Sequence, residues 1–152
     1  MTFDQPTLKG RALRLLGARE YSRAELERKL ARFEEQPGSL AAALDELHAK
    51  GFISEQRVVE SVLNRRGSKL GTQRIRLELQ AKGVDAQAVA SAVSELHATE
   101  HVRALAVWQK KFGTVPSDAA TAARQMRFLA ARGFSADVIR RVVKAGLDDI
   151  PV

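Results

Sequence analysis

The chain has 152 residues, enough for one domain to bury most of the surface that its unfolded form exposes, and it contains no cysteine. The lack of cysteine excludes thiolate catalysis and cysteine-based zinc sites, and it fits a reducing cytoplasm. A net charge of +7 favours an anionic partner, either nucleic acid or an acidic protein, while an aromatic content of 5% argues against a surface that stacks bases.

Apolar spacing predicts helices from the start of the chain. The segment Leu8–Leu16 has the pattern of an apolar helix. Ser22 and Glu25 then have the spacing of a capping box, in which two side chains satisfy orphan backbone donors at a helix start. Two leucine-rich stretches follow and end at breaks near Gly38 and Gly51. We therefore expect three short helices in the first 51 residues.

Two further sets of helices follow the same plan. Ser54 and Asp85 are suitable N-caps, and apolar residues follow each at helical spacing. We expect an inter-helix joint at Ala98–Thr99, a third set beginning near Glu100, and Ser117 as a cap within that set. No stretch alternates apolar and polar residues for long enough to form a strand. The predicted fold is all-α.

The three sets repeat with a common period. Aligning Ser22, Gly71 and Ala119 gives a spacing of roughly 48 residues, long enough for three short helices. We predict one domain over residues 1–152, built from tandem three-helix repeats at approximately 8–51, 52–98 and 99–147. Repeats that contact mainly their neighbours form an elongated, curved body with a concave surface for another macromolecule.

The most basic stretch joins the first and second helices of the second repeat. Between Arg57 and Arg76, six basic residues accompany one acid, Glu60. Positive charge at a helix start opposes the helix dipole, so stability does not require it. A solvated arginine-rich face is one interpretation, and contact with an anionic partner is the other. The candidate partner-binding residues are Arg65, Arg66, Lys69, Arg74, Arg76 and Lys82.

Patterns for catalysis and metal binding are weak. His97 and His101 are four residues apart, but the expected joint at Ala98–Thr99 separates them. The loop Gly67–Thr72 lacks the residue order and the preceding strand of a phosphate loop. Trp108 shares a helical face with apolar residues, which favours core packing. We expect no catalytic, cofactor or metal site, no small-molecule substrate and no enzymatic activity.

No uncharged apolar run reaches the ~20 residues of a membrane span, and the N-terminus lacks a signal-peptide pattern. These features predict a soluble cytoplasmic protein with no membrane contact. We also expect a monomer.

Several short motifs occur in a fixed order along the chain. They are Ala12-Leu13-Arg14-Leu15-Leu16, Ser22-Arg23-Ala24-Glu25-Leu26, Gly51-Phe52-Ile53, Arg74-Ile75 with Lys82-Gly83-Val84, and Arg127-Phe128-Leu129 with Arg132-Gly133-Phe134. In this order and spacing they resemble the RecX family of bacterial regulatory proteins over nearly the whole chain. The resemblance implies three tandem three-helix units in a cytoplasmic, non-enzymatic protein that binds the RecA filament. It also implies regulation of recombination and the SOS response, usually by inhibiting RecA ATPase, strand exchange and coprotease activity.

The chain departs from the family pattern after its first repeat. Ser54 and Glu55 stand where the family typically has two aspartates, and Val58 replaces an expected aromatic residue. Ser54 can still cap the following helix, so the fold is expected to survive, while any partner contact by those acids is in question.

A helix-turn-helix protein that acts on DNA directly is the second hypothesis, because each three-helix unit resembles one. The predicted third helices present mostly alanine, serine and valine, which suit packing better than base recognition.

Overall fold

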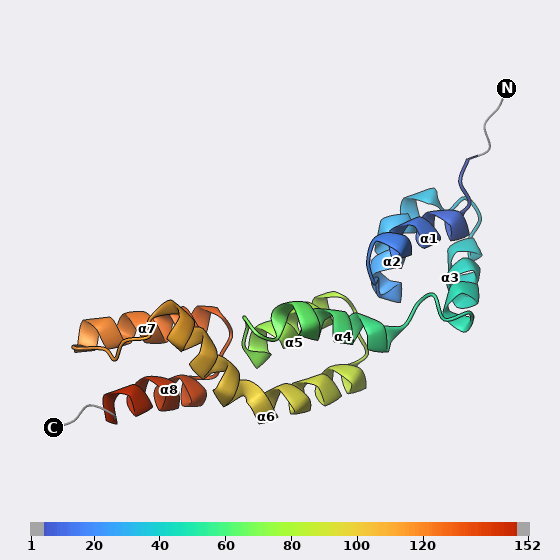
Figure 1. The fold of residues 1–152 in the computed structure, drawn as a ribbon. Coiled ribbons are helices and arrows are strands. Elements are labelled where there is room, and N and C mark those ends of the chain that lie inside the picture. The colour runs from blue at the N-terminus through green and yellow to red at the C-terminus, as the bar shows by residue number, and fades with distance from the viewer. Residues whose placement is uncertain (1–4, 149–152) are drawn as a thin grey trace.

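The computed structural model describes residues 5–148, which form three helical bundles in a row (Figure 1). The first bundle contains α1 (Leu8–Ala18), α2 (Arg23–Leu30), a 3-10 helix η1 (Ala31–Phe33) and α3 (Ser39–Ala49). The second contains α4 (Glu55–Arg66), α5 (Thr72–Ala81) and the first half of α6 (Ala86–Lys111). The third contains the rest of α6, α7 (Ala119–Ala131) and α8 (Ala136–Asp148). The described residues include no strand, and the row bends after the first bundle. The predicted all-α, elongated and curved array of three-helix repeats is confirmed.

Side-chain caps fix where most helices begin. At α7, however, the cap is Asp118 rather than the predicted Ser117: its carboxylate accepts a hydrogen bond from Thr121 N at 2.7 Å. A carboxylate at this position also interacts favourably with the helix dipole, which a serine hydroxyl does not match. The predicted caps that the structure confirms are Ser22 with its Glu25 capping box, Ser54 and Asp85.

Helix α6 runs unbroken through the junction of the second and third repeats, so the joint expected at Ala98–Thr99 is wrong. The helix is 26 residues long, and no glycine or proline interrupts it. Leu96 and Ala104 are both buried on its inner face, in the cores of the second and third repeats respectively. Packing on both sides of the junction holds the helix continuous where composition alone suggested a break.

Each repeat has its own apolar core. Leu26 and Leu44 are fully buried in the first, Ile75 in the second and Leu129 in the third. Trp108 also lies in the third core, as predicted, and its indole N–H donates to the side-chain oxygen of Gln125 at 2.8 Å. Because the cores are separate, the array depends on contacts between repeats for its shape.

Polar contacts join the first repeat to the second. The start of α2 packs on the turn between α5 and α6, where the Ser22 hydroxyl donates to the Lys82 carbonyl. The Arg28 guanidinium donates to the Ala81 carbonyl at 2.9 Å. The Lys82 ammonium lies 3.3 Å from the Glu25 carboxylate. Helix α2 thus makes several contacts to the end of α5 and the turn that follows it.

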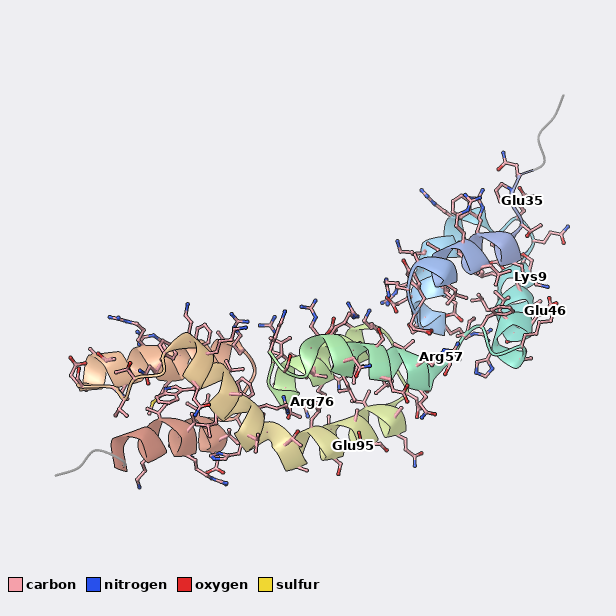
Figure 2. The ribbon with its side chains drawn as sticks, viewed as in Figure 1. Lys9, Glu35, Glu46, Arg57, Arg76 and Glu95 are labelled. Atoms are coloured by element: carbon pink, nitrogen blue, oxygen red, sulfur yellow. The ribbon has the colours of Figure 1, made fainter. Side chains whose placement is uncertain are left out.

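Arg57 strengthens the same junction from the start of α4 (Figure 2). Its guanidinium pairs with Glu20 of the first repeat at 2.9 Å and donates to the carbonyls of Gly51 and Phe52 in the linker. Within residues 5–148, the first junction therefore consists of ion pairs and hydrogen bonds rather than a shared apolar core.

We expect acid to weaken the first junction through Glu25. Partial burial opposes ionisation of its carboxyl group, but hydrogen bonds from Arg19 and the Ser22 amide, together with the charge of Lys82, outweigh burial and lower the pKa of Glu25. A lowered pKa stabilises the folded state above the usual glutamate pKa of about 4.3. That stabilisation is lost as the pH falls through the folded-state value.

Urea unfolding of the wild type and of Glu25→Gln at about pH 7 and about pH 3 measures this contribution. We expect the substitution to lower the free energy of unfolding by about 1 kcal/mol at neutral pH, and by less in acid. Glu95→Gln is the control, because Glu95 is exposed on α6 and is in none of the ion pairs of the described residues (Figure 2). An equal effect of Glu25→Gln at both pH values would contradict the expectation.

Candidate functional site

The basic loop between α4 and α5 is held by one arginine of α6. The Arg103 guanidinium donates to the carbonyls of Gly67 at 3.1 Å, Leu70 at 2.6 Å and Leu96 at 2.9 Å, and to the Thr72 hydroxyl at 3.2 Å. Burial lowers the pKa of Arg103, but a guanidinium remains charged at any physiological pH. One partly buried cation therefore fixes both ends of the loop.

Glu100, one turn before Arg103, completes this attachment. Its carboxylate is buried and accepts a hydrogen bond from the Thr72 amide at 3.2 Å. That amide is one of the orphan donors at the start of α5. The charge of Glu100 also favours the charged form of Arg103. The two side chains set the position of α5 against α6.

The start of α5 packs on the turn between α7 and α8. The Gly71 amide donates to the Arg132 carbonyl at 2.7 Å, and the Arg74 guanidinium donates to the Ala131 carbonyl at 2.8 Å. A Cβ atom on Gly71 would lie 2.3 Å from the backbone of Gly133, closer than real Cβ contacts. Only glycine at position 71 allows the two backbones to meet.

Two basic hollows lie beside this contact, and we call them together the junction groove. Arg132 borders both of its hollows, which have volumes of about 510 and 670 Å³. Phe128 forms part of the wall, with Arg132 and Lys111 over its ring at 4.9 and 5.4 Å from the centroid. The basic residues of the groove are Arg66, Lys69, Arg74, Lys110, Lys111 and Arg132.

Acids neutralise little of this charge. Glu78 is the acid that lines the groove, and its carboxylate is 3.7 Å from Arg66. The ion pairs formed within residues 5–148 include none with Lys69, Lys110 or Lys111. The groove thus presents uncompensated positive charge from α5, from α6, from the loop between α4 and α5, and from the turn after α7.

The structure brings together three of the six predicted binding residues and separates the others. Arg66, Lys69 and Arg74 line the junction groove. Arg65 is exposed at the end of α4, outside the groove lining. Arg76 lies between the ribbons of α5 and α6 and donates to the Gln73 side chain at 2.5 Å (Figure 2). A role for these residues in partner binding stays a prediction.

Lys82 lies apart from the rest. It is at the opposite end of α5, where its side chain is 15% exposed and paired with Glu25. Its described contact is therefore with the first repeat. Lys110 and Lys111, at the end of α6, are groove residues that no sequence pattern singled out, because only folding brings them near Lys69.

The continuous α6 places His97 and His101 on one helix, contrary to the expected joint. The His97 ring lies 3.9 Å from the buried Glu100 carboxylate. No group of three or more potential metal ligands occurs in the part of the chain that the structure describes. That part also contains no helix long and apolar enough to cross a membrane.

Comparison with known proteins gives consistent matches in all three repeats. Family models for the first, second and third three-helix domains of RecX match residues 9–47, 54–93 and 99–143. A protein of Leptothrix cholodnii named "Regulatory protein RecX" is 51% identical over 92% of this chain and 89% of its own length. A protein of the same name from Chromobacterium violaceum is 44% identical over 98% of this chain and 97% of its own.

Solved structures have the same fold. The crystal structure of RecX from Lactobacillus salivarius aligns with a TM-score of 0.77 at 20% identity, over 94% of this chain and 96% of that one.

We expect Arg103→Met to destabilise the protein by about 3 kcal/mol. The substitution keeps an unbranched side chain, but it leaves the loop carbonyls without their charged donor and the buried Glu100 without a neighbouring positive charge. Urea unfolding measures the loss, with Arg124→Met as the control, because Arg124 is exposed on α7 and its replacement should change stability by about 0.5 kcal/mol or less. Equal stability of the two variants would show that Arg103 does not hold the loop.

Proposed function

The chain belongs to the RecX family of regulatory proteins, and from this premise we propose that it binds the RecA–DNA filament and inhibits RecA ATPase, strand exchange and coprotease activity. In this proposal the protein regulates recombination and the SOS response without catalysing a reaction. The observation that carries the site assignment is the uncompensated charge of the junction groove, at the contact between two repeats.

Charge and shape both support this assignment. A hollow lined by positive charges attracts an anionic surface and raises the rate at which the two molecules associate. Lys69, Lys110 and Lys111 are exposed and free to pair with acidic side chains of the filament or with its DNA. Arg103 and Glu100 hold the groove wall in place before binding, which reduces the ordering cost on association.

The elongated array adds a second argument. Three bundles in a row offer a binding surface longer than one compact domain would (Figure 1). A protein of this shape can contact neighbouring subunits of a filament at the same time. Such bridging explains how a few bound molecules could affect many subunits.

We expect the wild type to inhibit RecA ATPase when it is present well below the RecA concentration. The assay uses saturating single-stranded DNA in excess, so that competition for DNA cannot cause the loss. The variant Lys69→Gln/Lys110→Gln/Lys111→Gln should need at least about tenfold more protein for the same inhibition, because it lacks three groove cations.

The matched control is Arg140→Gln/Arg141→Gln/Lys144→Gln, which removes three exposed charges from α8, outside the groove lining. It should inhibit like the wild type. Equal potency of the groove variant and the control would remove the groove as the contact surface. A wild type without effect on the ATPase, but with salt-sensitive DNA binding, would favour the hypothesis that the protein acts on DNA directly.

A further inference from the structure

The first repeat contains a second basic cavity, which shares no lining residue with the junction groove. It lies between α1, α2 and η1 and has a volume of about 470 Å³. Leu15 and Leu30 form part of its wall. Its remaining lining residues are five cations and one aromatic residue, namely Arg11, Arg14, Arg28, Lys29, Arg32 and Phe33. We call this cavity the α1–α2 site.

Several acids of the first repeat form ion pairs with cations that do not line the α1–α2 site. Glu46 pairs with Lys9 and Lys50, and these cations lower the pKa of Glu46 to about 2 (Figure 2). Arg23 pairs with both Glu27 and Asp45. These acids therefore face cations outside the α1–α2 site.

The cations of the α1–α2 site have no such partners. Among residues 5–148, the ion pairs include none with Arg11, Arg14, Lys29 or Arg32. Arg28 makes its hydrogen bond to a backbone carbonyl, which leaves its charge uncompensated. Of the nearby acids, Glu34 is occupied in accepting from the amides of Gly38 and Leu40. The site thus brings several positive charges close together, and the stability of the fold does not require this.

Phe33 holds two of these cations in place. The guanidinium carbon of Arg11 lies 3.7 Å from the ring centroid, and that of Arg32 lies 4.6 Å from it. Cation–π contacts of this kind are attractive even at exposed sites. The guanidinium groups of Arg11 and Arg32 are therefore partly ordered before a ligand binds, which lowers the entropic cost of binding.

We infer that the α1–α2 site binds the phosphodiester backbone of single-stranded nucleic acid. Guanidinium forks match phosphate oxygens in geometry and charge, and neighbouring phosphates of one strand can occupy several cations together. The partly exposed Leu15 and the guanidinium planes provide surface for unstacked bases, which a single strand has and a duplex lacks. This binding requires no RecA and goes beyond the proposed function.

The two basic surfaces lie at opposite ends of α5. Arg28 of the α1–α2 site contacts Ala81 at the end of this helix, while Arg74 of the junction groove lies near its start. Seven residues of helix separate Ala81 from Arg74, a rise of roughly 10 Å. A nucleic-acid strand at one surface and a protein partner at the other can therefore be bound side by side.

The test measures binding of a fluorescent oligothymidylate by anisotropy over a range of salt concentrations, without RecA. The variant Arg11→Gln/Arg14→Gln/Arg32→Gln should bind at least about tenfold more weakly than the wild type. Its slope of log affinity against log salt should be less negative by about 2, since three phosphate contacts are lost at about 0.7 each. Circular dichroism melting checks that the variant is folded.

The control is again Arg140→Gln/Arg141→Gln/Lys144→Gln, which removes the same charge from α8 and should bind like the wild type. Wild-type affinity and slope in the Arg11/Arg14/Arg32 variant would overturn the inference. Tighter binding of a duplex of equal length, or displacement of the oligonucleotide by polyglutamate at lower charge concentration, would also overturn it. Because the assay contains no RecA, failure of the proposed function leaves its result unaffected, and the reverse also holds.

Discussion

The contact between Gly71 and the turn at Gly133 sets the arrangement of the second and third repeats. The two backbones are so close that a Cβ atom at either position would overlap the opposite segment. Gly133 also has a φ of +93°, a conformation that residues with side chains rarely adopt. Since Lys69 and Arg132 flank this contact, the junction groove has its shape only because the two backbones meet.

The two junctions of the array use the same geometry with different reinforcement. At the first junction, the start of α2 packs on the turn between α5 and α6. At the second, the start of α5 packs on the equivalent turn of the next repeat, between α7 and α8. The second junction adds the continuous α6 and the partly buried Arg103, so the second and third repeats form one body. The first junction has neither and depends on exposed or partly exposed ion pairs such as Arg57–Glu20, which contribute little individually. Motion between repeats is therefore expected at the first junction.

The sequence patterns predicted the features that depend on residues close together along the chain. The repeat, most of the caps and the core positions follow from local spacing, as the Ser22–Glu25 box illustrates. Contacts across the array were not predictable in this way. Arg103 holds a loop more than 30 residues away, and Lys110 joins Lys69 in a groove only after folding. Lys82 follows Arg76 by only six residues. It contacts the first repeat, however, because it lies at the far end of α5 from the junction groove.

A net charge of +7 understates the positive charge that the surface presents, because the acids are unevenly placed. Asp45 and Glu46 neutralise cations on one side of the first repeat, while Arg11 and Arg32 across the bundle share one aromatic ring. Exposed ion pairs contribute about 0–1 kcal/mol, so an acid beside these arginines would cost the fold nothing. Crowded cations without acids disfavour folding slightly and favour an anionic ligand strongly. We therefore attribute the segregation to ligand binding at the α1–α2 site rather than to stability.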